Sequence, residues 1–164
     1  MIHNVYISIG TNKGNKVNNC HLAIKNLRNI SKISEISSFY KTSSWGYEDD
    51  FYLNFVVQIR TIFSPNILLD KLLFIEKEMG RIRVSNRYES RMIDFDILFF
   101  DNLVLESSKL TIPHPQLYFR KFVLIPLLEI APNLMCPQKK IKIFDLLREC
   151  NDQNSVEKFL FENK

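Results

Sequence analysis

Two aspartates separated by one residue, Asp94 and Asp96, form the most informative chemical pattern in the sequence. They lie in an apolar stretch at 93–100, and successive side chains of a β-strand point to opposite faces, so both carboxylates are expected on one face. The apolar residues expected on the other face are Ile93, Phe95, Ile97 and Phe99. Neighbouring carboxylates repel each other unless a cation lies between them, and Mg²⁺ takes one or two carboxylates and completes its shell with water and phosphates. The pattern therefore indicates a magnesium site, with solvent-facing or arginine-bridged aspartates as the alternative.

Arginines recur at short intervals just before this stretch. They are Arg81, Arg83, Arg87 and Arg91. A guanidinium group matches phosphate oxygens two at a time, so this cluster beside a metal site indicates a polyphosphate clamp, in a loop long enough to act as a lid. A solvated surface loop is the alternative.

His114 lies between two prolines, with Lys109 and Arg120 at a modest distance along the chain. A lone histidine serves either a structural or a functional role, and the sequence pattern leaves both open. The two flanking basic residues are compatible with an anionic ligand.

Three further residues are of the kinds that bind a flat heterocycle. Tyr52 and Phe122 offer rings for stacking, and Asn54 offers an amide for hydrogen bonds to a ring edge. Such residues also commonly fill a core or satisfy a neighbouring strand, which is the alternative.

The elements that must position these groups follow one another in a known order. Strands are predicted at 5–9, 33–41, 53–62 and 93–100, and helices at 17–30 and from Ser64 as cap to Gly80. Polar loops are expected at 11–15, 42–50 and 81–92, and a turn at Asp101 and Asn102. This is the order of the ferredoxin-like split βαβ unit, so we expect an α+β fold with helices packed on an antiparallel sheet. C-terminal additions should follow, with short elements at 103–105 and 111–115, an apolar segment at 122–130 broken by Pro126, and a helical tail.

Composition limits the class of protein. The 164 residues are 46% hydrophobic and 24% charged, which is typical of one folded domain, 1–164, and not of a disordered chain. No apolar run has the length of a membrane span and the start lacks a signal-peptide pattern, so a cytoplasmic location is expected. The net charge of +4 suits a phosphate-bearing ligand. Cys20, Cys136 and Cys150 have no metal-binding or disulfide spacing and are expected to be buried thiols.

Taken in chain order, these patterns resemble the 6-hydroxymethyl-7,8-dihydropterin pyrophosphokinase family over about residues 4–137. The matching segments are 6–12, 37–42, 52–54, 76–83, 91–97, 113–114 and 126–132. The resemblance implies the ferredoxin-like α+β fold. It also implies transfer of diphosphate from ATP to the hydroxymethyl group of the pterin, with release of AMP, in folate biosynthesis. The implied partners are these small molecules alone, without nucleic acid or membrane, and the implied state is a monomer.

The resemblance also implies roles for individual residues. Asp94 and Asp96 would hold two Mg²⁺ ions that bridge the ATP phosphates and, with Arg81 and Arg91, would form the catalytic set. The ATP contacts it implies are Arg83, Tyr88, Ile97, Lys109, Thr111, His114 and Arg120. The pterin contacts it implies are Gly10, Thr42, Ser43, Ser44, Trp45, Tyr52, Asn54 and Phe122. The pterin ring would lie between the rings of Tyr52 and Phe122, while Asn54 contacts its amide edge.

The sequence departs from the family pattern at three places. Residues 87–91 read Arg-Tyr-Glu-Ser-Arg instead of Arg-Trp-Gly-Pro-Arg, residues 42–44 read Thr-Ser-Ser instead of Thr-Pro-Pro, and Leu73 replaces a common glutamine. These changes bear on loop closure and on nucleotide contacts more than on the chemistry. Two other functions stay open from the residues themselves: a ferredoxin-like RNA-binding module, which would carry aromatic residues on the exposed face of its sheet, and a catalytically inactive relative.

Overall fold

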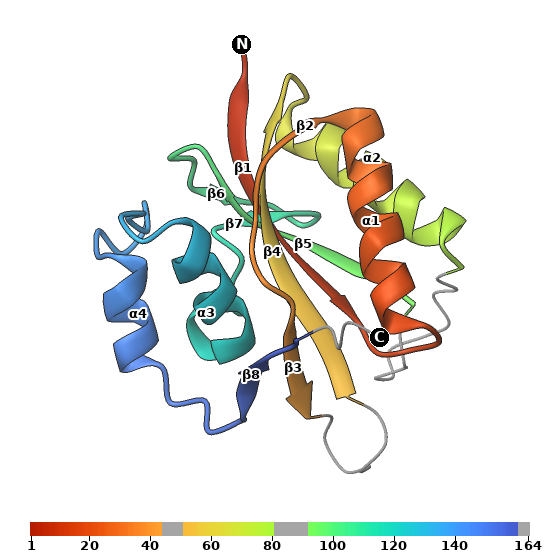
Figure 1. The fold of residues 1–164 in the computed structure, drawn as a ribbon. Helices are drawn as coiled ribbons and strands as arrows, with labels where there is room; N and C mark the ends of the chain where they lie inside the picture. The colour runs from red at the N-terminus through yellow and green to blue at the C-terminus, as the bar shows by residue number, and fades with distance from the viewer. Residues whose placement is uncertain (44–50, 81–91, 161–164) are drawn as a thin grey trace.

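The sheet is built around β1 (His3–Thr11) and β4 (Phe51–Thr61), which run antiparallel in register from His3 opposite Thr61 to Thr11 opposite Leu53. The computed structural model describes residues 1–43, 51–80 and 92–160. Its main sheet has the order β5-β1-β4-β3-β8, with β2 also paired to β4 (Figure 1). The other strands are β2 (Lys32–Ile36), β3 (Tyr40–Ser43), β5 (Asp94–Phe100) and β8 (Val156–Lys158). Every pairing is antiparallel, and the first strand lies between the third and fourth strands of the core, so the predicted ferredoxin-like α+β fold is confirmed.

Helices α1 (Lys16–Ile30) and α2 (Pro65–Glu78) cover one face of the sheet (Figure 1). The Asn15 side chain accepts a hydrogen bond from the Asn18 N–H at 3.0 Å and so begins α1, while Pro65 occupies the first turn of α2. Gly80 follows the end of α2 with a φ of 92°, a conformation that favours glycine. The predicted cap Ser64 takes the expected position, but within residues 51–80 its side chain makes no capping hydrogen bond.

Helices α3 (Lys121–Ile130) and α4 (Ile143–Glu149) cover the opposite face (Figure 1). The predicted break at Pro126 is wrong, because α3 continues through this residue. Val123, Leu124 and Leu127 are almost wholly buried against the sheet, and this packing outweighs the loss of one backbone hydrogen bond. The prediction of a helical tail is only partly right, because α4 is followed by a segment without helix or strand and then by β8 at the sheet edge.

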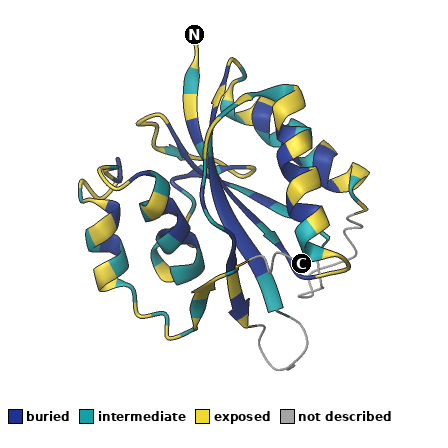
Figure 2. Cartoon of the chain, in the orientation of Figure 1, coloured by how far each residue is buried: buried dark blue, intermediate teal, exposed yellow. Residues whose placement is uncertain are grey.

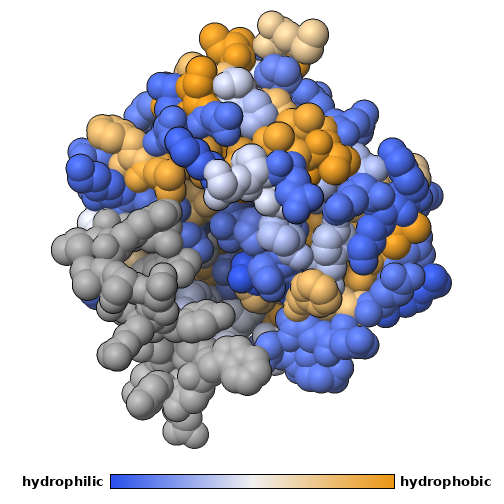
Figure 3. Space-filling view, turned by 180° about the vertical axis from the view of Figure 1, so that it is seen from behind, coloured by the Kyte–Doolittle hydropathy of each residue, from blue (hydrophilic) through white to orange (hydrophobic). Residues whose placement is uncertain are grey.

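Two apolar cores result, one on each face of the sheet. Figure 2 shows buried residues along the strands and on the helix sides that face them. Exposed apolar groups on the face in Figure 3 lie in separate patches among hydrophilic ones, as is normal for a protein surface. Cys20 and Cys136 are buried free thiols as predicted, whereas Cys150 is half-buried. None of the helices in the described parts of the chain is long and apolar enough to cross a membrane.

Strand β5 contains a bulge that changes which face its residues occupy. Ile97 lies opposite Ile7 but Phe99 lies opposite Tyr6, so Leu98 is an extra residue in the pairing with β1. Phe95 and Ile97 therefore pack in the core beneath α1 and α2. Leu98 and Phe99 pack in the core beneath α3 and α4. The prediction that Phe99 shares a face with Phe95 and Ile97 is wrong, since strict alternation ends at the bulge.

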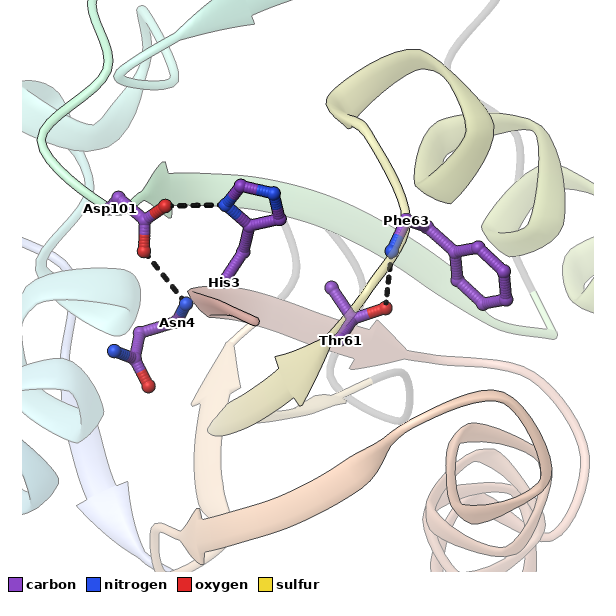
Figure 4. Close-up of polar contacts among 5 residues, drawn as sticks. All are labelled: His3, Asn4, Thr61, Phe63 and Asp101. Atoms are coloured by element: carbon purple, nitrogen blue, oxygen red, sulfur yellow. Dashed lines mark hydrogen bonds and ion pairs between the residues drawn. The ribbon is translucent and has the colours of Figure 1, made fainter. Parts of the chain in front are cut away.

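A turn at Asp101 closes the far end of β5 as predicted (Figure 4). Asp101 has a φ of 46°, and its carboxylate accepts a hydrogen bond from the Asn4 N–H at 2.8 Å and lies 2.7 Å from Nδ1 of His3. Aspartate is well suited to such a position because its short side chain satisfies nearby backbone groups. The chain then forms a two-stranded sheet of β6 (Leu105–Glu106) and β7 (Thr111–Ile112) and a 3₁₀ turn at Leu117–Phe119.

Candidate active site

One row of residues crosses the sheet on the face that α3 covers. The pairing registers place Asp94 opposite Gly10, Gly10 opposite Asn54, and Asn54 opposite Tyr40. Val5, Ile7 and Ile9 pack beneath α1 and α2, so the even-numbered positions of β1, including Gly10, face α3. Because neighbouring strands lie about 4.8 Å apart, the backbones of Asp94 and Asn54 are about 10 Å apart. The carboxylates and the amide singled out from the sequence thus share one face.

Asp94 and Asp96 are both half-buried at the start of β5, on the face predicted for them. Oδ1 of Asp96 lies 3.5 Å from Nε2 of His114, and Oδ2 lies 3.7 Å from a guanidinium nitrogen of Arg120. Nδ1 of His114 accepts a hydrogen bond from the Gln116 N–H at 3.2 Å, so in the neutral ring Nε2 carries the proton that faces Asp96. Residues far apart in sequence therefore gather around one carboxylate.

This donor set fits magnesium better than a transition metal. Across residues 1–43, 51–80 and 92–160, no group of three or more histidine, cysteine or acidic side chains is arranged to hold a metal ion. Mg²⁺ is bound in proteins by one or two carboxylates together with water and phosphate oxygens, and it does not need a cage of protein ligands. The pair of Asp94 and Asp96 matches that requirement.

Two buried polar side chains hold the segment that leads into β5. Glu76 of α2 is 2% exposed, and its Oε1 accepts a hydrogen bond from the Phe95 N–H at 2.9 Å. Nδ2 of Asn19 in α1 donates to the carbonyl oxygens of Lys13 at 2.8 Å and Met92 at 3.2 Å. Sequence reasoning missed Asn19, although a polar residue on the apolar side of a predicted helix is a usable signal. These bonds fix the backbone on which Asp94 is carried.

The amide of Asn54 is fixed from two sides. Its Nδ2 donates a hydrogen bond to Oγ1 of Thr42 at 2.9 Å, and both residues are about 95% buried. Its Oδ1 lies over Gly10, where an added Cβ atom would be only 2.7 Å away. Glycine is therefore required here by a close approach of a side chain. Tyr52 lies opposite Thr42 and faces the same side of the sheet.

The remaining predicted site residues are placed less closely together. Phe122 is half-buried in the first turn of α3, with the Arg120 guanidinium 5.8 Å from the centre of its ring. Thr111 lies on β7, and Lys109 and Ser43 are exposed. The Ile97 side chain is 2% exposed in the core beneath α1 and α2, which leaves its backbone for any ligand contact. The predictions that lie outside the described residues are Ser44, Trp45, Arg81, Arg83, Arg87, Tyr88, Glu89 and Arg91.

A carboxylate that sequence reasoning did not single out, Glu129 near the end of α3, connects this helix to β3. It accepts hydrogen bonds from the Ser38 N–H at 3.0 Å, the Ser38 hydroxyl at 2.8 Å and the Tyr40 hydroxyl at 2.5 Å. Burial favours the protonated acid, but these hydrogen bonds and the charge of Lys158 outweigh it and hold the pKa of Glu129 below its ordinary value. Burial and the bond to this carboxylate raise the pKa of Tyr40. The available signal was a single acidic residue in a helix that is apolar apart from Lys121 at its start.

Comparison with known proteins shows extensive similarity. A model of the 7,8-dihydro-6-hydroxymethylpterin-pyrophosphokinase (HPPK) family matches residues 6–132. The chain is 38% identical over 154 residues to the 2-amino-4-hydroxy-6-hydroxymethyldihydropteridine pyrophosphokinase of Haemophilus influenzae, covering 92% of this chain and 95% of that protein. It is 36% identical over 149 residues to the protein of the same name from Synechocystis, covering 90% and 76%.

The fold comparison agrees. A crystal structure of the Plasmodium falciparum HPPK-DHPS protein with pteroate superposes with a TM-score of 0.74 at 16% identity. The match covers 91% of this chain and 42% of that one, so this chain spans less than half of that solved protein. At this level of identity the comparison shows the fold alone.

Proposed function

The chain belongs to the 7,8-dihydro-6-hydroxymethylpterin-pyrophosphokinase family, and we propose that its reaction takes place along the row of residues from Asp94 to Asn54. The protein transfers diphosphate from ATP to the hydroxymethyl group of 6-hydroxymethyl-7,8-dihydropterin, giving AMP and the pterin diphosphate, in folate synthesis. One observation carries the placement: the strand register puts carboxylates suited to a metal–phosphate complex and a fixed amide on the same face. Gly10 lies between them.

Asp94 and Asp96 are the residues that would hold Mg²⁺. When bound, Mg²⁺ supplies positive charge to the phosphate oxygens and helps to orient them. Arg120 and His114 lie within 3.7 Å of the Asp96 carboxylate and limit its orientations, and the Arg120 guanidinium places further positive charge beside the phosphate position. The dependence on Mg²⁺ and the number of two ions are part of this proposal.

Asn54 would orient the pterin. The hydrogen bond from Nδ2 of Asn54 to Thr42 fixes the orientation of the amide, so that its Oδ1 presents an acceptor over Gly10. The rings of Tyr52 and Phe122 would enclose the heterocycle. Held in this way, the hydroxymethyl oxygen attacks the β-phosphorus of ATP in line and AMP leaves, a reaction in which positioning and charge stabilisation supply most of the acceleration. The proposal also keeps the roles that the family resemblance implies for three arginines. Arg81 and Arg91 belong to the catalytic set, and Arg83 contacts ATP.

The two alternative functions that the sequence leaves open, an RNA-binding module and an inactive relative, can each be distinguished from a pyrophosphokinase. Family membership and the paired carboxylates on the α3 face favour a pyrophosphokinase over a module that binds RNA on its sheet. An inactive relative would bind ligands without forming AMP. From the sequence, we also propose that the protein is a single-domain monomer located in the cytoplasm.

Asp96→Ala tests the site. We expect wild-type protein to release AMP when ATP, Mg²⁺ and the hydroxymethyl pterin are present together, and not when the pterin is omitted. The variant should lose at least about a hundredfold in turnover, because charge stabilisation at the reacting phosphates is removed. Asp145→Ala is the matched control, since this carboxylate lies on α4 and pairs with Arg148 at 3.3 Å. A near-normal rate for Asp96→Ala at saturating Mg²⁺ would refute the assignment.

A further inference from the structure

The first turn of α3 presents two proposed site residues, Arg120 and Phe122, but it does not cap itself. Arg120 occupies the N-cap position with extended backbone angles. In the part of the chain that the structure describes, its side chain makes no capping hydrogen bond, and the first turn of α3 holds no acidic residue. The first N–H groups of an α-helix lack partners within the helix, and a side chain usually accepts from at least one of them. The acceptor must come from elsewhere.

Asp152, 31 residues further along the chain, supplies it. Its Oδ2 accepts a hydrogen bond from the Lys121 N–H, in the first turn of α3, at 3.0 Å. Its Oδ1 accepts from the Asn154 N–H at 3.0 Å and from the Asn154 side-chain amide at 2.7 Å. The carboxylate is thus held from both sides, and its negative charge lies at the positive end of the α3 dipole.

The segment that carries Asp152 is attached to the fold at both ends. Before it, Ile143 and Leu146 of α4 pack in the core beneath α3. After it, β8 pairs with β3, with Val156 opposite Thr42. The segment also lies beyond residues 6–132, which the family model matches. It therefore joins α3 to the strand that fixes Asn54, from a part of the sequence outside the recognised motifs.

We propose that Asp152 is a positioning residue for the pterin side of the active site, because it fixes the backbone turn from which Phe122 projects. This inference rests on the proposed function. Phe122 follows Lys121 directly, and its short, stiff side chain must follow any displacement of that backbone. The long side chain of Arg120 can compensate for the same displacement and still reach Asp96. Loss of the cap should therefore weaken pterin binding more than nucleotide binding.

The test compares wild type, Asp152→Ala and Asp152→Asn, with Asp145→Ala as a control carboxylate in the same C-terminal region. The pterin is titrated by calorimetry into protein saturated with Mg²⁺ and a nonreactive ATP analogue, and the analogue is titrated separately, all well below the unfolding transition. If all of the free energy of the capping interaction contributes to pterin binding, its loss changes the pterin affinity about tenfold. We expect Asp152→Ala to raise the pterin Kd and KM roughly three- to tenfold and the analogue Kd less than about twofold.

The conservative variant and the control make the result specific. Asp152→Asn keeps an oxygen acceptor for the Lys121 N–H and should recover most of the pterin affinity, while Asp145→Ala should bind as wild type does. An Asp152→Ala protein that unfolds more easily but binds pterin normally, or that loses both affinities equally, overturns the proposal. If wild-type protein binds pterin without forming AMP, the proposed function is wrong. The binding titrations still decide whether Asp152 positions the pterin side of the site. A wild-type protein that does not bind pterin overturns both.

Discussion

Replacing Gly10 with alanine should break the arrangement at the centre of the site. The strand backbone at Gly10 accepts an L side chain, because its φ is not among the positive values found in the described residues. The difficulty is contact: the new Cβ would lie 2.7 Å from Oδ1 of Asn54. To reach the 3.4 Å of an ordinary contact, the oxygen must retreat by about 0.7 Å. That movement pulls Nδ2 away from Thr42, to which it donates at 2.9 Å.

The expected cost follows from these contacts. Overpacking a well-filled interior costs about 1–3 kcal/mol. Leaving a buried donor or acceptor without its partner costs a similar amount, about 1–3 kcal/mol. The two costs are alternatives to each other, since movement of Asn54 relieves the contact but breaks the bond to Thr42. We therefore expect Gly10→Ala to lower the free energy of unfolding by about 2 kcal/mol.

A double-mutant cycle measured by urea unfolding tests this reasoning. Asn54→Ala removes the oxygen that the new Cβ meets, so in that background Gly10→Ala should cost less than about 0.5 kcal/mol. The coupling free energy between the two positions should then exceed about 1 kcal/mol. If Gly10→Ala cost the same in both backgrounds, the close approach of Asn54 would not be the reason for glycine at this position.

Two further predictions concern titratable groups. The pKa of Glu129 is held below its ordinary value of 4.5, so the unfolded state binds more protons than the folded state as the pH falls. The stability from this group is present above that ordinary value and lost as the pH falls through the lower folded pKa. Between about pH 6.5 and about pH 3.5, wild type should therefore lose more unfolding free energy than Glu129→Gln, and parallel losses would contradict the prediction. Burial raises the pKa of Cys20 to about 12, so its thiol stays protonated at about pH 8 and should be alkylated much more slowly than half-buried Cys150. Peptide mass spectrometry after brief labelling measures both rates, and equal rates would show that Cys20 is accessible.

The core elements were predictable because local signals agree with the fold. The apolar alternation of β1, the helical periods of α1 and α2 and the long apolar run of β4 each indicate the observed element. The predicted strand at 33–41 is in fact two strands, β2 and β3. The position of Asp94 and Asp96 on one face was also predictable, because strict alternation holds over that part of β5.

The features that were not predicted depend on distant parts of the chain. The hydrogen bond between Tyr40 and Glu129 joins residues 89 apart in sequence, and the cap from Asp152 joins residues 31 apart. No periodic pattern specifies such partners. β8 is only three residues long, too short for a propensity signal, and it forms because the edge of β3 offers unpaired backbone groups. The bulge at Leu98 likewise follows from how β5 must fit β1 and both cores.

That bulge decides which apolar groups β5 presents to the face that α3 covers. A strand without the extra residue would place Phe99 on the same side as Phe95. The α3 face would then receive alternate residues from Asp94 onward in one unbroken series. With Leu98 inserted, β5 presents acids to that face at one end and two adjacent apolar groups at the other. The boundary between wet and dry surface falls between Asp96 and Leu98, within a single short strand, and the helix that covers the dry half begins beside the acids.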